Sequence, residues 1–425
     1  MQVSEHVQEG QETSSVRRLP LYAYYVANTI SYVGNRCTFV AIPWFVLETT
    51  GSVTQTAITA FFTTLPMVLS AFFGSVFVDR VGSKRTSILS DLLSALTVMC
   101  IPLLHLFGIL AFWQLLALVF ISGLLKAPGE TGREMLLPTL VKQAGIRMER
   151  ATAAADGVSR LSSFLALPLA AALVALIGAS NLLWIDAVSF LLSALLIGAC
   201  VPSVALARRE SSEKRGIKGY FADLGSGIAF LKYEPVILTT LATVLITNLL
   251  DGGLSTVIAP AYTKYYFHSP VPLGTIFGVM GGAAFVGTII FGAIGHRLPR
   301  RLTFGLCFCI GGGLRFLAMA FVPNMWFLTI AHAFMGLALG PLNPLLSTIL
   351  YERVPENMRA RVFGVLAAGS SIGIPVGELL SGYLVNGVGI QNSLIITGSI
   401  YMLVTLSLLV NPKLRAMDRS VEAAV

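Results

Sequence analysis

The chain has 425 residues, of which 55% are hydrophobic and only 12% are charged, and its mean hydropathy is +0.79. A soluble domain carries about 25% charged residues, so the composition excludes an ordinary soluble protein and indicates an all-α protein that spans a membrane. The net charge of +8 would suit a nucleic-acid partner only if the basic residues formed one patch, and their placement along the chain excludes this.

The apolar segments of the chain predict two bundles of six helices. The first 16 residues hold three glutamates and no lysine or arginine, which is unlike a signal peptide and predicts a cytoplasmic tail over 1–19. An N-terminal bundle over 20–202 and a C-terminal bundle over 235–411 are joined by a linker at 203–234 and followed by a cytoplasmic tail at 412–425. Each of twelve segments is long enough to cross a bilayer as a helix. The expected spans are 20–47, 54–78, 86–108, 111–135, 151–177, 181–202, 235–259, 272–296, 302–322, 325–350, 360–385 and 391–411.

The linker is expected to carry a short amphipathic helix. Its apolar residues Phe221, Leu224, Ile228 and Leu231 recur at helical spacing, which is typical of a helix that lies on a membrane face.

Lysine and arginine are distributed very unevenly between the two sides of the membrane. The tails and the loops after every second span, counted with the span ends beside them, hold 24 of the 29. The other loops hold Lys264 alone, and four lie deeper within spans. Because basic residues stay on the cytoplasmic side, both termini are expected in the cytoplasm. The same distribution explains the positive charge without nucleic acid.

The two halves of the chain repeat each other. Residues 123–128, Gly-Leu-Leu-Lys-Ala-Pro, correspond to residues 336–341, Gly-Leu-Ala-Leu-Gly-Pro, 213 positions later. Residues 41–43 correspond to 258–260 at an offset of 217. An apolar chain of two parallel repeats is an architecture of secondary transporters, whose substrate site lies between the repeats near the bilayer midplane.

The strongest local motif, Gly-Ser-Val-Phe-Val-Asp-Arg-Val-Gly-Ser-Lys-Arg, lies at 74–85 between the second and third spans. It resembles the loop 2–3 signature of the major facilitator superfamily, although Ser75 and Ser83 replace a usual glycine and a usual basic residue. The resemblance implies that Asp79 faces the N-terminal end of the eleventh helix, where the helix dipole favours a carboxylate, and that the basic residues hold the two halves together. The residues expected to form this conformational gate are Gly74, Asp79, Arg80, Gly82, Lys84 and Arg85.

Further segments resemble the branch of this superfamily that holds the enterobactin exporter and the macrolide efflux proteins. They are residues 41–52, 133–141, 187–194, 227–231 and 234–237. This resemblance covers nearly the whole chain. It implies an exporter in a bacterial cytoplasmic (inner) membrane, with helices 1, 4, 7 and 10 around a central cavity.

Charged residues inside apolar spans are costly and are therefore functional candidates. Arg36 lies seven residues before Pro43, and Asp251 lies nine before Pro260. Because these prolines correspond in the repeat, the two charges are expected within about 3 Å of the same depth on facing helices. They are candidates for a pair that opens to accept substrate or a proton, with a permanent salt bridge as the alternative. The amides expected to bind polar ligand atoms beside them are Asn35 and Asn248.

Other charges in the spans give further candidates for substrate binding or proton coupling. Lys126 and Glu130 are four residues apart and share a helix face, so both are expected to face the cavity unless Glu130 meets water at the cytoplasmic end. Asp156 is either part of a proton relay or satisfied by Arg160 on the same face. Glu378 is a candidate for titration during transport.

Three charged residues are interpreted structurally rather than functionally. Asp91 is expected to interact with a helix dipole, Asp186 to cap or pack a helix, and Arg315 to find a structural partner at the periphery. The five cysteines have no spacing that fits a metal site.

The function that the sequence favours is proton-driven export of an amphipathic small molecule. The molecule would be a drug, a macrolide or a siderophore-like compound, carried by alternating access through a monomer in the bilayer. A phosphate-binding loop and a His-Glu-x-x-His motif are both missing from the sequence, so neither an enzyme nor a cofactor or metal is expected, and the proton gradient is the expected source of energy. Residues 167–172 keep the proline but not the glycines of a helix 5 motif common in antiporters. Import or uniport of a polar metabolite therefore stays open, as does a lipid or lysolipid flippase.

Overall fold

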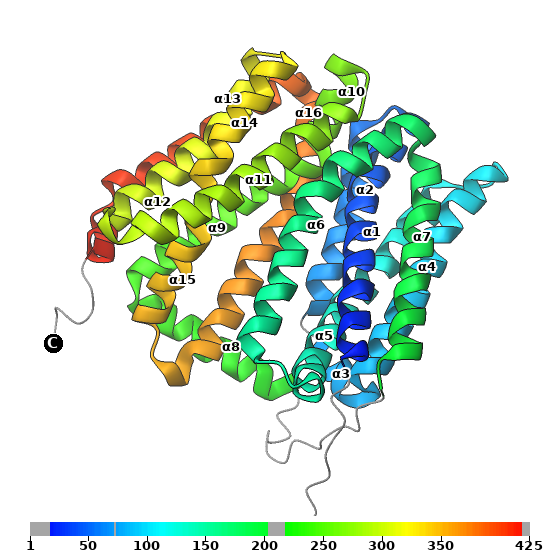
Figure 1. The fold of residues 1–425 in the computed structure, drawn as a ribbon. Helices are drawn as coiled ribbons and strands as arrows, with labels where there is room; N and C mark the ends of the chain where they lie inside the picture. Colours follow the sequence, from blue (N-terminus) through cyan, green and yellow to red (C-terminus); the bar gives the residue numbers. More distant parts are fainter. Residues whose placement is uncertain (1–17, 72–73, 203–216, 419–425) are drawn as a thin grey trace, which may run out of the picture.

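The computed structural model describes residues 18–71, 74–202 and 217–418, and this part of the chain consists of helices and short connections (Figure 1). The first half contains α1 (Leu19–Thr50), α2 (Val53–Ala71), α3 (Gly74–Val81), α4 (Ser83–Leu106), α5 (Phe112–Ala144), α6 (Met148–Ile177) and α7 (Ala179–Cys200). The second half contains α8 (Ile217–Tyr233), α9 (Pro235–Gly253), η1 (Leu254–Ile258), α10 (Ala259–Phe267), α11 (Val271–Ile294), η2 (Gly295–Arg297), α12 (Arg300–Phe308), η3 (Cys309–Gly313), α13 (Leu314–Phe321), α14 (Met325–Leu339), α15 (Leu342–Arg353), η4 (Glu356–Met358), α16 (Arg359–Val410) and η5 (Pro412–Asp418).

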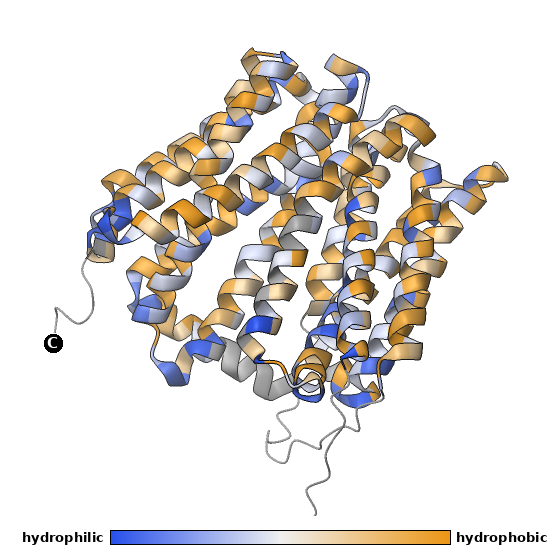
Figure 2. Ribbon diagram, viewed as in Figure 1, coloured by the Kyte–Doolittle hydropathy of each residue, from blue (hydrophilic) through white to orange (hydrophobic). Residues whose placement is uncertain are grey.

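The predicted number of twelve spans agrees with these helices. Within the described ranges, ten helical stretches are long and apolar enough to cross a membrane. One of them, in α16, forms two spans because Gly389 breaks the helix with φ 82° and ψ 167°. The twelfth span is α6, which has 30 residues and an apolar part at Phe164–Ile177. Hydrophobic residues cover the middle of the helices (Figure 2), a surface that suits contact with lipid.

The helices pack as two bundles that follow the chain (Figure 1). In the first, α1 packs against α6 and α7, and α4 packs against α5 and α7. In the second, α9 packs against α16, and α11 packs against α14. Contacts between the bundles come mainly from α2 with α16 and from α6 with α11.

One close helix crossing is built twice, once in each bundle. A Cβ atom on Gly123 would lie 2.4 Å from the carbonyl oxygen of Thr63, and one on Gly336 would lie 2.3 Å from that of Met280. Gly336 follows Gly123 by 213 residues, and Met280 follows Thr63 by 217. These are the two offsets of the sequence repeat, so the repeat appears in the structure as a repeated glycine contact.

The bundles meet tightly at one end of the molecule. We call the end that holds Leu19 and Val410 the terminal face and the opposite end the outer face. Near the outer face, a Cβ on Gly274 would lie 2.6 Å from the carbonyl oxygen of Leu167, and one on Gly382 would lie 2.1 Å from the Cβ of Ala57. Only glycine permits such approaches, and these contacts close the outer face.

Helix α8 lies where the linker was expected to be helical. Leu231 is buried together with Ile237, Val354 and Val362, whereas Ile228 is 46% exposed. The side chains of the two other predicted apolar positions lie outside the described residues.

The packing of α16 on α9 gives a first testable prediction. A Cβ on Gly377 would lie 1.7 Å from the backbone oxygen of Leu249, whereas one on Gly364, in the same helix, meets nothing within 4 Å. We expect Gly377→Ala to cost about 1–3 kcal/mol because the two helices must move apart. The control Gly364→Ala is expected to be neutral or to stabilise by up to about 1 kcal/mol. Thermal unfolding of both purified variants measures this, and equal melting temperatures would contradict the close approach.

Candidate functional site

Two adjoining cavities lie between the bundles. The smaller, of about 520 Å³, is lined by α1, α2 and α5 on one side and by α9, η1 and α16 on the other. The larger, of about 1130 Å³, extends along α6, α11, α12 and α15 toward the terminal face. Tyr32, Asn248 and Asp251 line both cavities. The two cavities therefore adjoin at the centre of the molecule, and the larger one lies on the terminal side of the close glycine contacts.

Most of the residues predicted for a central site line the smaller cavity. They come from both bundles: α1 and α5 provide four, and α9 and α16 provide three. These residues are Asn35, Arg36, Lys126, Glu130, Asn248, Asp251 and Glu378. The eighth candidate, Asp156, belongs to α6, and its side chain lies outside the described part of the structure.

Polar side chains without a charge complete the wall of the smaller cavity, and the sequence analysis missed them. Apart from the two predicted amides, they are Tyr32, Thr38, Thr56, Thr63, Thr64, Ser122, Ser255 and Thr256. Each is common inside membrane helices, where a threonine or serine hydroxyl bonds a carbonyl in the preceding turn. The sequence therefore offers no signal that separates cavity hydroxyls from the others.

The expected pairing of Arg36 with Asp251 is wrong for this conformation. Asp251 forms an ion pair with Arg315 of α13 in its own bundle. The guanidinium carbon of Arg36 lies 5.4 Å from the centre of the Tyr32 ring. Arg36 has no ion pair among the described residues. Between Asp251 and Pro260 the chain forms the π-helical turn η1, whereas α1 is an uninterrupted α-helix. The extra residue of a π-turn rotates what precedes it by about 100°, which directs Asp251 toward Arg315.

Arg315 is therefore the ion-pair partner of a cavity residue, Asp251. The sequence analysis expected a structural partner for it, but at the periphery of the fold. Its side chain is only 5% exposed, while that of Asp251 is 32% exposed toward the cavities. In this ion pair, the carboxylate of Asp251 lies at the cavity wall, and the guanidinium group of Arg315 lies behind it.

Glu378 of α16 contacts both bundles. Its Oε1 accepts a hydrogen bond from Thr64 of α2 at 3.0 Å, and Thr256 of η1 lies 3.2 Å from the same oxygen. The residue is 1% exposed, and Oε2 has no hydrogen-bond partner among the described residues. A buried carboxyl oxygen without a partner is costly, so this position is a candidate for function.

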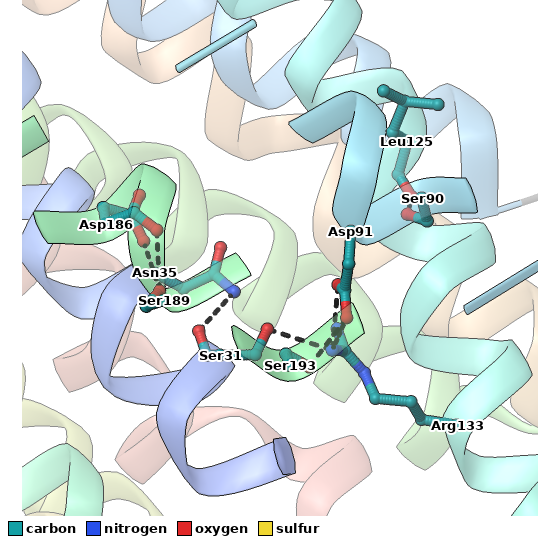
Figure 3. A network of polar contacts seen from close by, with 9 residues as sticks. All are labelled: Ser31, Asn35, Ser90, Asp91, Leu125, Arg133, Asp186, Ser189 and Ser193. Carbon is teal, nitrogen blue, oxygen red and sulfur yellow. Dashed lines mark hydrogen bonds and ion pairs between the residues drawn. The ribbon is translucent and has the colours of Figure 1, made fainter. Parts of the chain in front are cut away.

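A second buried ion pair lies inside the first bundle (Figure 3). Arg133 Nη1 donates to Asp91 Oδ1 at 3.1 Å and to Ser31 Oγ at 3.0 Å, and Ser193 Oγ donates to Asp91 Oδ2 at 2.7 Å. The network joins α1, α4, α5 and α7. Asp91 thus has an ion-pair partner instead of only a helix dipole, because α5 continues to Ala144 and carries Arg133 inside the bundle.

Asp186 is a third buried carboxylate, and it lies behind the cavity wall. It accepts hydrogen bonds from Thr38 and, at 3.2 Å, from Ser189. This arrangement suits the packing role expected for it, and Thr38 separates it from the cavity.

The loop 2–3 motif does not join the bundles here. Asp79, Arg80 and Arg85 are exposed, and Asp79 has neither a hydrogen bond nor an ion pair within the described ranges. Lys84 Nζ donates to the carbonyl oxygen of Gly198 at 2.8 Å, which lies in the same bundle. The expected contact of Asp79 with the eleventh helix is therefore not formed in this conformation. The bundles meet near the outer face, whereas the larger cavity separates them on the side of the terminal face, where Asp79 lies.

Two more motif residues shape this turn locally. Gly82 has φ 95°, a value that favours glycine. Gly74 is buried, and a Cβ there would lie 3.2 Å from the hydroxyl of Thr131. Around the turn and elsewhere in the described ranges, no three His, Cys, Asp or Glu side chains gather as metal ligands.

Comparison with known proteins adds the family. The sequence model of the Major Facilitator Superfamily matches residues 24–251 and 241–423. The multidrug efflux pump Tap of Mycolicibacterium fortuitum is 27% identical over 411 residues, which cover 95% of this chain and 98% of the relative. Macrolide efflux protein A of Streptococcus pyogenes is 18% identical over 402 residues, covering 94% and 98%.

Solved transporters share the fold at low sequence identity. The nucleoside transporter NupG superimposes with a TM-score of 0.74 at 13% identity, covering 92% of this chain and 98% of NupG. A POT family transporter in complex with 5-aminolevulinic acid gives 0.67 at 13% identity, covering 92% and 95%. Because the family model matches both halves and the helices form two bundles of six spans, the chain belongs to the Major Facilitator Superfamily and is an integral, multi-pass membrane protein.

Proposed function

We propose that this protein exports amphipathic small molecules, such as drugs, macrolides or siderophore-like compounds, from a bacterial cytoplasm in exchange for protons. The observation that carries the proposal is the pair of cavities between the bundles, which extend toward the terminal face, while close glycine contacts join the bundles near the outer face. The names of two relatives, a multidrug efflux pump and a macrolide efflux protein, support export.

The cavities suit an amphipathic ligand. Together they exceed the roughly 300–1,000 Å³ that most small-molecule sites occupy, and apolar side chains such as Phe39, Ile42 and Phe277 lie among the polar ones. Transport would proceed by rocking of the two bundles about this midplane site. The glycine contacts at the outer face would part while the terminal face closes.

Efflux in cells that lack their own drug pumps tests this function. The protein should lower the accumulation of ethidium and raise the inhibitory concentrations of a macrolide panel, and a protonophore should abolish both effects. Lys126→Met, in the cavity wall, should impair efflux, whereas Lys142→Met, exposed on the same helix, should behave like the unsubstituted protein. Accumulation instead of loss of the probes would indicate import, and efflux that survives the protonophore would exclude proton coupling.

The charge distribution predicts that the terminal face is cytoplasmic. A cysteine at Glu356, whose side chain is 87% exposed at that face, should resist an impermeant maleimide in intact cells. A cysteine at Phe107, 68% exposed at the outer face, should react. The reverse labelling pattern would invert the orientation, and the unsubstituted protein controls for the native cysteines.

Asp79→Asn is expected to slow transport without lowering protein abundance. Asp79 is exposed and unpartnered among the described residues in this conformation, so its charge is expected to act when the terminal face closes. A charge that favours one of two conformations typically changes the free-energy difference between them by about 1–3 kcal/mol, which shifts the conformational equilibrium roughly 5- to 150-fold. Ethidium efflux and protein levels should be compared with Glu356→Gln, an exposed carboxylate on the same face. Equal rates of ethidium efflux in the two variants would show that the motif only forms a turn and has no role in transport.

A further inference from the structure

Glu378 is a cavity-wall carboxyl group that has no cation beside it. The two hydroxyls nearest to it, those of Thr64 and Thr256, are neutral, and it forms no salt bridge within the described ranges. Two other buried acidic residues, Asp91 and Asp251, each form an ion pair with an arginine. Asp186 is buried without an ion pair, like Glu378, but it lies behind the cavity wall rather than in it. Glu378 therefore lacks the countercharge that a permanently ionised group needs in such a place.

The elements around Glu378 do not supply that charge. Helix α2 and the turn η1 contain no ionisable residue, and α9 contributes only Asp251, which Arg315 already neutralises. Across the smaller cavity, α1 presents Arg36 and α5 presents Lys126 and Glu130. These three residues share the cavity with Glu378 without contacting it, so they can influence its charge only through the cavity.

The hydrogen-bond geometry suits a carboxyl group that carries a proton. Thr256 has one hydroxyl hydrogen, and the carbonyl oxygen of Gly252 accepts it at 2.9 Å, a shorter distance than the 3.2 Å to Glu378. Thr256 therefore shares its hydrogen between the two oxygens, and its bond to Glu378 is the longer of the two. Among the described residues, Glu378 thus receives one hydrogen bond from Thr64 and a share of a second from Thr256. Burying an ionised carboxylate with so little support is costly, whereas a protonated carboxyl group carries no charge to support.

The space at Oε2 limits what can bind there. This atom is buried and has no partner among the described residues, and on the same helix Gly377 and Gly382 pack closely against α9 and α2. Glu378 lines the smaller cavity, but this oxygen is not accessible from it in the present conformation. A proton needs no space.

We propose that Glu378 is the group that binds the coupling proton, in place of Asp251; this inference rests on the proposed proton-driven export. When the outer face opens, α2 separates from α16, the bond from Thr64 breaks, and the carboxylate takes a proton from water on the outer side. When the outer face closes, the neutral carboxyl group is buried between Thr64 and Thr256. Water in the cavity then accepts the proton on the terminal side, and the carboxylate is restored for the next cycle.

Infrared difference spectroscopy of the purified protein in lipid tests the proton site without any substrate. The unsubstituted protein should show the C=O band of a protonated carboxyl group that disappears at high pH and shifts when glutamate is labelled with carbon-13. Glu378→Gln should lack this band, and Asp186→Asn, a buried carboxylate outside the proposed path, should keep it. Persistence of the labelled band in Glu378→Gln would overturn the proposal.

A second variant protects the test against misfolding. Thr64→Val keeps the carboxyl group and removes the hydrogen bond between the bundles, so it should move the pH at which the band disappears. An unchanged pH in this variant would contradict the coupling of Glu378 to the contact between α2 and α16.

Transport in proteoliposomes separates this proposal from the proposed function. With an imposed pH gradient, the unsubstituted protein should accumulate ethidium above equilibrium, whereas Glu378→Gln should lose accumulation and keep ethidium exchange at equal pH. If the unsubstituted protein shows no gradient-driven transport, proton coupling fails, and the infrared result alone decides whether Glu378 binds a proton. Full gradient-driven accumulation by Glu378→Gln would overturn the assignment of the coupling site.

Discussion

Replacing Arg133 with methionine is expected to reduce the free energy of unfolding by about 3–5 kcal/mol, because it leaves the charge of Asp91 buried without its partner. The two side chains are 7% and 2% exposed, so water cannot replace the lost contact. The remaining donor to the carboxylate among the described residues is Ser193, which supplies one hydrogen bond. Chemical unfolding in detergent, followed by circular dichroism, measures the loss.

A double replacement tests the physical reason. Arg133→Met with Asp91→Leu should recover much of the stability, because deleting a buried pair costs less than breaking it. Lys142→Met, on the same helix but exposed, should change stability by less than about 0.5 kcal/mol. If the double variant lost the sum of the two single losses, the residues would not interact.

Replacing Asp251 with asparagine is expected to cost about 3–5 kcal/mol, because it leaves Arg315 unpaired while only 5% exposed. Water that reaches Asp251 from the cavity does not reach Arg315 behind it. Combining Asp251→Asn with Arg315→Gln should restore folding, measured as the melting temperature of the purified protein.

Arg36→Gln is the matched control for this pair. Arg36 lines the same cavity but contacts only the ring of Tyr32 among charged and aromatic groups in the described ranges, so its loss should leave the melting temperature nearly unchanged. A large loss in Arg36→Gln, with recovery on adding Asp251→Asn, would instead support the pairing expected from the sequence.

The spans were predictable from the sequence because the bilayer demands a length of apolar residues whatever the tertiary contacts. The helix ends were not, because hydropathy marks the membrane and not the end of the helix. Helix α5 was expected to end near residue 135 but continues to Ala144, which is why Arg133 was counted with the basic residues at the cytoplasmic end and not as a charge inside the bundle. Its partner Asp91 was then left with only a dipole to interact with.

The depth of the central candidates was predictable, but their directions were not. Arg36, Asp251 and Glu378 all line one cavity, as a count of residues along each helix suggested for the first two. Which neighbour each side chain reaches depends on the rotation of its helix and on which helix lies beside it. Residue spacing along a single sequence determines neither. The π-helical turn η3 (Cys309–Gly313) comes directly before Arg315 and affects its direction. The turn η1 rotates Asp251 and so contributes to the exchange of Arg36 for Arg315 as its partner.

That same turn has an evolutionary consequence. A π-helical turn differs from an α-helical one by a single residue, so a lineage can gain or lose it through one inserted or deleted codon. Such a change would present a different stripe of the residues of α9 to the ligand without replacing any of them. Relatives of this protein can therefore differ in the compounds they carry while an alignment shows the same lining residues, and the informative difference between them is a one-residue gap near 254–258.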